Sequence, residues 1–330
     1  DLVIGNPTSL VYTYPGKGYI RYGRPRAEWP VGNVYISSFR DVIFAGGDRG
    51  FDFGNSCAVA DVNGDNMPDV IFGKWVTDSA ETIDGEGDWS GAVFGFFNRG
   101  YYSPYETEAD NDFFIRGYCP EPFGERDMIG TTVRSGGDFD SDGFEDIFIS
   151  HGISWHATGT PFPMLIPYWE DFYGLPLVFS GRNYIIWGKP ESEWEDSLFL
   201  SPFAEESFSV LFSGSNCYMF GGQDFNGDGF GDLVACEWGY CYDSLYDYAP
   251  YDTSRLYIKW GPAHPVSDSL KHFADKIIYS RYPDDQTGRT MAGGDFNGDS
   301  IADLAVGGST AFNDLAIIYL QPGGEDWSSV

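Results

Sequence analysis

Short apolar runs recur along the chain, and each of them begins directly after an aspartate. The five runs follow Asp1, Asp69, Asp146, Asp232 and Asp303. Their apolar residues are continuous and do not alternate with polar ones, which is typical of strands covered on both faces. We therefore expect five equivalent β-strands at these positions, each buried between two layers of structure.

Other strand-like segments surround each run. A segment rich in aromatic and β-branched residues follows it, the pattern of a half-buried strand, in residues 18–23, 91–96, 183–188, 255–261 and 314–319. A shorter strand is expected before four of the runs, in residues 54–60, 130–134, 217–220 and 290–292. A weaker fourth strand is expected between repeats, for instance at residues 34–37 with 41–44, or at 276–279. Helix is expected only at residues 268–274, over at most two turns.

About four short antiparallel strands form one repeat, which is the size of a β-propeller blade. Because a single blade cannot bury both of its faces, blades pack against one another around an axis. The sequence therefore predicts an all-β fold, a single β-propeller domain over residues 1–330. Its blade units are expected at approximately 1–50, 51–128, 129–213, 214–286 and 287–330, with the first and the last incomplete.

The loop before four of the runs carries a repeated pattern of oxygen-bearing side chains. They stand at loop positions 1, 3, 5 and 9, and the residue at position 7 can offer its main-chain carbonyl. The loops begin 71 to 86 residues apart, and four copies of one spacing argue against a chance acidic turn. The candidate metal ligands are Asp61, Asn63, Asp65, Met67 and Asp69; Asp138, Asp140, Asp142, Phe144 and Asp146; Asp224, Asn226, Asp228, Phe230 and Asp232; and Asp295, Asn297, Asp299, Ile301 and Asp303.

Calcium is the expected cofactor, with about four ions, because it takes six to eight oxygen ligands. An EF-hand is excluded, since its loop closes with glutamate at position 12, between helices. Position 6 favours glycine for a left-handed turn, so Asn66 and Ser300 predict weaker binding by the loops at Asp61 and Asp295. We expect structural ions that neutralise clustered carboxylates.

The repeat that runs from Phe53-Gly54 through Asp61-Val-Asn-Gly-Asp to Gly73 resembles the FG-GAP repeat. The resemblance covers essentially the whole chain as five units. It implies a calcium-bearing β-propeller like the head of integrin α subunits, in which the metal loop joins the first two strands of a blade. Integrin propellers have seven blades, so the resemblance does not give the blade number of this chain.

The amino-acid composition limits which partners and which cellular location are expected. A net charge of −31 argues against binding to nucleic acid or to anionic membrane surfaces. The chain has no apolar run of about 18 residues, so membrane insertion is not expected. Calcium loops of this kind suit a compartment rich in calcium, and we expect an extracellular protein, secreted or on the cell surface.

The five cysteines fit no zinc or haem motif. Cys236 and Cys241 are the best candidates for a local disulfide, and free thiols are the alternative. The full set is Cys57, Cys119, Cys217, Cys236 and Cys241.

Three functions are considered. The first is a non-catalytic module for adhesion, interaction or surface assembly, for example a filament subunit. The second is lectin-like carbohydrate binding through exposed aromatic residues, chiefly Trp155, Trp169, Tyr173, Trp238 and Tyr240, with Tyr168 and Tyr242 beside them. The third is a polysaccharide lyase or hydrolase that uses His151 and His156 near Arg182 and Tyr184, or His264 and His272. The enzyme is the least favoured, because no hydrolase, metalloprotease or phosphate-loop motif is present.

The expected partner is a protein. Incomplete terminal blades would expose unpaired strand edges, and such edges accept a strand from a neighbouring chain. A head-to-tail assembly of copies is one form of this hypothesis. The alternative is that the sequence is part of a larger propeller.

Overall fold

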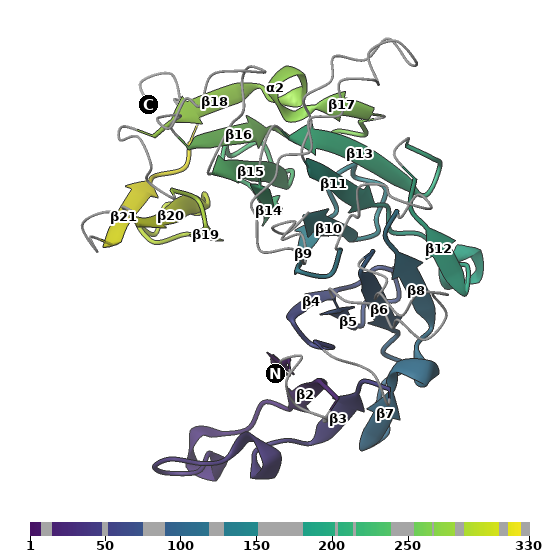
Figure 1. The fold of residues 1–330 in the computed structure, drawn as a ribbon. Coiled ribbons are helices and arrows are strands. Elements are labelled where there is room, and N and C mark those ends of the chain that lie inside the picture. The colour runs from purple at the N-terminus through teal and green to yellow at the C-terminus, as the bar shows by residue number, and fades with distance from the viewer. Residues whose placement is uncertain are drawn as a thin grey trace, which may run out of the picture. The chain divides into compact units, whose positions relative to one another are not determined.

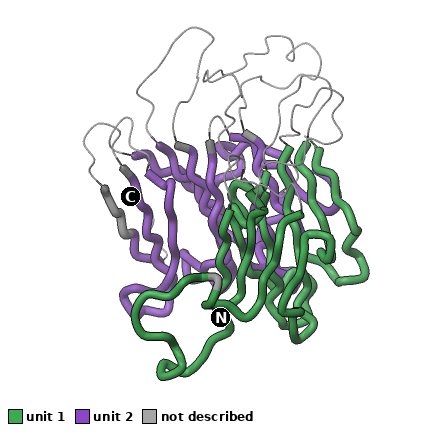
Figure 2. Tube along the Cα trace, turned by 60° about the horizontal axis from the view of Figure 1, so that its bottom comes forward, with its two compact units in different colours: residues 1–134, 188–201 green, residues 135–187, 202–330 purple. Residues whose placement is uncertain are grey.

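The computed structural model of this chain describes residues 1–7, 15–47, 52–74, 90–118, 129–150, 181–201, 204–213, 216–238, 254–265, 267–280, 287–309 and 316–324. These residues form an all-β fold of five sheets, with short helical turns between some of the strands (Figure 1). The chain divides into two compact units, coloured separately in Figure 2. The first unit is Asp1–Arg134 with Gly188–Ser201, and the second is Ser135–Trp187 with Pro202–Val330.

The first unit contains two sheets, in the strand orders β1-β2-β3-β7 and β12-β8-β6-β5-β4. The strands of the first sheet are β1 (Leu2–Asn6), β2 (Lys17–Arg21), β3 (Val42–Ala45) and β7 (Tyr105–Thr107). Those of the second sheet are β4 (Ser56–Ala60), β5 (Asp69–Lys74), β6 (Ala92–Phe96), β8 (Phe113–Arg116) and β12 (Ser197–Phe199). The described residues of this unit also include the single-turn 3-10 helices η1 (Arg26–Glu28), η2 (Ile36–Ser38), η4 (Glu108–Asp110) and η5 (Glu191–Glu193).

The second unit, whose range begins within β9, contains the other three sheets. The third sheet has the order β17-β13-β11-β10-β9, the fourth β14-β15-β16-β18 and the fifth β19-β20-β21. The strands of the third sheet are β9 (Thr132–Gly137), β10 (Asp146–Ser150), β11 (Gly181–Ile186), β13 (Phe208–Ser213) and β17 (Ser267–Ser269). Those of the fourth and fifth are β14 (Asn216–Gln223), β15 (Asp232–Trp238), β16 (Arg255–Lys259), β18 (Lys276–Tyr279), β19 (Thr290–Gly294), β20 (Asp303–Ser309) and β21 (Ala316–Gln321). The helix α2 (Leu270–Phe273) is one turn long, within the short stretch expected to be helical.

The repeated order of strands confirms the blade-like units. The five runs that follow an aspartate are β1, β5, β10, β15 and β20, and each pairs antiparallel with the aromatic strand that comes next in the chain. In four of the sheets the fourth strand of the repeat then adds to the same sheet, as β8 does beside β6, whereas the fifth sheet has three strands among the described residues. The fold is thus an assembly of propeller blades. Its expected division into one domain with five sequence units stays a prediction.

Three sheets also have an edge strand that the sequence pattern did not predict. In the chain, β7, β12 and β17 each lie between the third and fourth strands of one repeat, yet they pair in parallel with the fourth strand of the preceding repeat. Parallel pairing of this kind requires a crossover in the chain. Each of these strands has only three residues, which is too short for a hydrophobic period to appear.

One expected strand is wrong. Residues 34–37 were expected to be extended, but η2 begins at Ile36, and Val34 and Tyr35 are exposed. The neighbouring expectation at 41–44 is confirmed by β3. Aromatic and β-branched residues favour a strand only where a neighbouring strand or sheet covers them, and local composition cannot show whether such a cover exists.

The cores lie between sheets within each unit. In the first unit, Phe44 and Ile20 of the first sheet pack with Phe72 and Phe94 of the second. In the second unit, one cluster joins the third and fourth sheets and another joins the fourth and fifth. Every residue of β5 and β10 is buried, as their continuous apolar sequences predict, whereas β1 is only partly covered.

The Phe148 ring shows why small residues face the core. Phe148 lies in β10 and is fully buried, and a Cβ added at Gly136 in β9 or at Gly221 in β14 would overlap its ring. These glycines therefore leave the space in which the third sheet packs its aromatic ring against the fourth.

Replacing this ring should be costly. We expect Phe148→Ala to lower the free energy of unfolding by about 3–5 kcal/mol, because it removes buried surface and leaves a cavity. The control Tyr101→Ala, at an exposed side chain, should change it by no more than about 0.5 kcal/mol. Urea unfolding followed by circular dichroism measures both, and equal effects of the two variants would contradict the packing described for Phe148.

Candidate metal centres

The four acidic loops are hairpin turns between the first and second strands of a sheet. They join β4 to β5, β9 to β10, β14 to β15 and β19 to β20, and each loop closes with the aspartate that opens its second strand. The expectation of a hairpin in place of a helix–loop–helix unit is therefore confirmed.

The carboxylate at position 1 organises each loop. Its two oxygens accept hydrogen bonds from the backbone N–H groups at positions 5 and 6, over 2.8 to 3.1 Å. In the exposed Asp295, the N–H of Ser300 is the main cause of a lowered pKa, so the loop itself keeps this carboxylate ionised. The backbone curls around the first ligand because the aspartate supplies acceptors that bind locally.

The side chains at positions 3 and 5 also accept hydrogen bonds from backbone N–H groups of the loop. The oxygen at position 3 accepts from the N–H at position 5, as Asn226 does from Asp228 over 2.9 Å. The carboxylate at position 5 accepts from the N–H at position 7, as Asp142 does from Phe144 over 2.9 Å. The same two contacts recur in the other loops, so the side chains of positions 1, 3 and 5 converge on one side of the turn.

The aspartate at position 9 has a different environment, because it is buried. One oxygen of its carboxylate accepts from the N–H at position 2, as in Asp69 with Val62. The other oxygen accepts from the N–H of the second residue after the third strand, as in Asp69 with Asn98. Burial raises the pKa of Asp69 and of Asp232 from 3.8 to about 7, although these backbone bonds lower it in part. A buried carboxylate without a cation is costly when ionised, and a bound divalent ion would offset that cost.

Asp1 makes one of the two backbone hydrogen bonds described for position 9. Its carboxylate accepts from the N–H of Gly23 over 2.6 Å, as Asp232 accepts from Gly261 over 3.0 Å and Asp303 from Gly323 over 2.8 Å. This contact is consistent with the expected equivalence of the strands that follow Asp1, Asp232 and Asp303.

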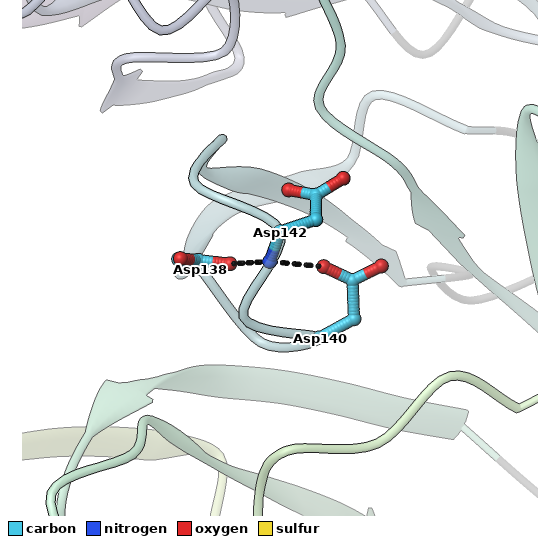
Figure 3. A group of neighbouring side chains, drawn as sticks. All are labelled: Asp138, Asp140 and Asp142. Atoms are coloured by element: carbon cyan, nitrogen blue, oxygen red, sulfur yellow. Dashed lines mark hydrogen bonds between the residues drawn. The ribbon is translucent and has the colours of Figure 1, made fainter.

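Three carboxylates gather most closely in the second loop. Oxygens of Asp138, Asp140 and Asp142 lie within 4.8 Å of one another (Figure 3). Partial burial, together with the charges of Asp140 and Asp138, raises the pKa of Asp142. The other three loops have asparagine at position 3 and so carry one carboxylate fewer. An all-oxygen donor set that crowds negative charge fits a hard divalent cation such as calcium. In the second loop Asp138, Asp140 and Asp142 would hold it, with Asp146 at the base of the turn.

The backbone angles change the expected comparison between loops. Position 6 is left-handed at Asn66 and Ser300, with φ of 64° and 71°, as the sequence led us to expect. Position 4 is left-handed as well, and there the second loop has Ser141 with φ of 64° where the others have glycine. The loop at Asp224 alone among the four has glycine at both places. The order of affinities stays a prediction, but the loop at Asp138 carries a strained residue that position 6 did not reveal.

Most of the expected aromatic ligand-binding residues lie outside the described residues. These are Trp155, Trp169, Tyr173 and Tyr240, with Tyr168 and Tyr242, and the same holds for His151, His156, Cys119 and Cys241. Trp238 is the last residue of β15. Tyr184 is fully buried against Phe208, which does not suit a group that meets a polysaccharide.

Three cysteines can be placed. Cys57 and Cys217 carry free thiols, and burial raises the pKa of both. Sγ of Cys236 lies 2.8 Å from the carbonyl oxygen of Thr287. The pairing of Cys236 with Cys241 therefore stays a prediction.

One residue that contacts an acidic loop was missed by the sequence analysis. Nδ1 of His264 lies 2.8 Å from Oδ2 of Asp140. These residues are 124 positions apart in the sequence, and no local pattern connects them. His272 contacts Asp268 instead, at 3.6 Å.

Comparison with known proteins gives one consistent result. No protein-family model matches the chain. Integrin alpha-4 of Xenopus laevis is 33% identical over 221 residues, which is 64% of this chain and 17% of that protein. Integrin alpha-PS3 of Drosophila melanogaster is 28% identical over 163 residues, or 48% of this chain and 12% of the relative, and integrin alpha-PS5 of the same species is 23% identical over 254 residues, or 76% and 21%. The matched part thus spans about a fifth or less of each relative's length.

Among the helices that the structure describes, none has the length and apolar character needed to cross a membrane.

Proposed function

We propose, from the relationship of this chain to the FG-GAP propeller repeats of integrin α subunits, that it is an adhesion-type propeller module without catalytic activity. The observation that carries the proposal is the similarity to several integrin α subunits, which extends over as much as 76% of the chain. The repeated loop-bearing hairpins support it independently, because they are the elements that the FG-GAP resemblance implies.

We further propose that the loops bind calcium and that the ions stabilise the blades. Each loop presents side-chain oxygens from positions 1, 3 and 5 on one side of a turn, with a buried aspartate at its base. Binding of an ion to such a site contributes to the free energy of folding. An extracellular location, secreted or at the cell surface, agrees with this use of calcium and with a net charge of −31.

The proposed partner is a protein, and binding can be tested directly. The purified chain is immobilised and exposed to a panel of extracellular matrix proteins and, separately, to a glycan array, with calcium and after chelation. We expect saturable, calcium-dependent binding to a protein and no turnover of acidic polysaccharides. Selective binding to glycans would favour the lectin hypothesis, and polysaccharide turnover would overturn the non-catalytic assignment.

Self-association is a separate prediction. Light scattering coupled to gel filtration gives the mass of the chain in solution across a concentration series. An increase in mass with concentration would support assembly through the terminal sheets, whereas a strict monomer would contradict it.

A further inference from the structure

The metal loops are attached to the repeat that follows them. In three loops, the carbonyl at position 2 accepts a backbone hydrogen bond from the segment after the third strand of the next repeat. Val62 accepts from Lys189 over 3.0 Å, and Phe139 accepts from Ala263 over 3.0 Å. Phe225 accepts from Gly324 over 2.9 Å. The position of this segment is therefore tied to the conformation of the loop.

The second loop has an additional contact, made by a side chain. Nδ1 of His264 lies 2.8 Å from Oδ2 of Asp140, the residue at position 3. The His264 ring stacks on Trp187, with the ring centroids 4.1 Å apart and the planes 17° apart. Trp187 is buried, so it gives the imidazole a fixed surface. The backbone next to His264 is held by the hydrogen bond from Ala263 to Phe139, and its ring is held by the Trp187 indole.

The chemistry of the contact is that of a support for a metal ligand. A carboxylate oxygen only accepts, so Nδ1 of His264 carries the proton in this hydrogen bond. The other oxygen of Asp140, Oδ1, accepts from the N–H of Asp142 over 3.2 Å. Asp140 is thus held at both oxygens, in an orientation that keeps it beside Asp138 and Asp142. Hydrogen bonds of this kind orient metal ligands, and their removal typically costs about 10- to 100-fold in metal affinity.

This loop also has the greater need of such support. It has aspartate where the other three have asparagine at position 3, and Ser141 where they have glycine at position 4. The third carboxylate increases the repulsion between ligands, and the left-handed serine adds backbone strain. A donor from His264 counters the repulsion, because it withdraws one oxygen of Asp140 from its acidic neighbours.

We propose that His264 is a positioning residue for the metal centre of the loop at Asp138, and that it couples occupation of this loop to the packing of the third sheet against the fourth. The inference rests on the proposed binding of calcium by the loops. It adds a residue from a different repeat to the centre at Asp138.

The test uses the whole chain and calcium itself. Isothermal titration measures the affinities, and Asp142→Ala identifies the binding step that belongs to this loop. We expect His264→Ala to weaken that step by about 10- to 100-fold and to leave the other steps unchanged. His264→Asn should recover most of the affinity, because the amide nitrogen of asparagine occupies nearly the same place as Nδ1. The control His272→Ala, at an exposed residue outside the loops, should bind as the parent chain does.

Two further readouts separate positioning from general stability. In the Asp142→Ala background, His264→Ala should have no further effect on calcium binding. Calcium should also change the fluorescence of the parent chain by an increment that disappears in Trp187→Phe. An unchanged affinity in His264→Ala, an equal loss in His264→Asn, or a persisting loss in the Asp142→Ala background would each overturn the assignment. If the parent chain bound no calcium, the proposed function would fail first, which the titration shows before any variant is made.

Discussion

Removal of divalent cations should lower the thermal stability of this chain substantially. The expected fall is about 5–10 °C for each loop that had been occupied, because an ion at 100 times its dissociation constant contributes about 2.7 kcal/mol. The physical reason is the repulsion among the carboxylates at positions 1, 5 and 9, which an ion offsets and water alone offsets poorly when position 9 is buried. Differential scanning calorimetry in calcium and after chelation measures the shift.

A single-loop variant makes this result specific. Asp142→Ala should lower the melting temperature in calcium but have a much smaller effect after chelation, since the loss is mainly that of a ligand. Glu193→Ala, at an exposed acid in η5, is the matched control and should change neither value appreciably. If excess chelator left the melting curve unaltered, the loops would be simple turns and the calcium assignment would be wrong.

The second large effect concerns pH in the metal-free chain. Between about pH 4 and pH 7, the stability of the metal-free chain should fall as pH rises. Asp69 and Asp232 have pKa values raised by burial from 3.8 to about 7, so the folded state binds more protons than the unfolded state in this range. Each of the two carboxyls contributes a slope of up to about 1.4 kcal/mol per pH unit. Stability is therefore present while they are protonated and is lost as they ionise in the folded state.

Urea unfolding of demetallated protein at pH 4.5, 5.5, 6.5 and 7.5 measures the slope. The net charge of −31 acts in the same direction, so Asp232→Asn is needed to isolate one carboxyl, and it should reduce the slope. Calcium should flatten or reverse the dependence, because the ion binds the ionised form. A stability that rises through this range without metal would contradict the stated cause of the raised pKa values.

The acidic loops could be predicted from sequence because nearly all their contacts are local. The Asp224 carboxylate accepts hydrogen bonds from the N–H groups three to five residues further along the chain. The side chains of Asn226 and Asp228 each accept from the N–H group two residues further along. Side-chain type and spacing within nine residues are therefore sufficient to define the turn. The strands that follow could be predicted for a similar reason, since a continuous apolar run such as Val70–Phe72 requires cover on both faces.

Contacts between distant segments could not be predicted in this way. The edge strands β7, β12 and β17 have three residues each and acquire their conformation by pairing with a strand of the preceding repeat. The segment at Val34 has a strand-like composition but no strand to pair with among the described residues, and it remains exposed.

The sequence by itself thus determined the all-β repeat, the order of strands within a repeat and the position of each acidic loop. Each of these depends on side chains that lie a few residues apart. Only the tertiary structure decided which sheet each short edge strand joins, that position 9 is buried deeply enough to raise the pKa of Asp69 and Asp232, and that His264 supports Asp140. Those features depend on the packing of sheets, which brings together residues whose separation along the chain carries no periodic signal.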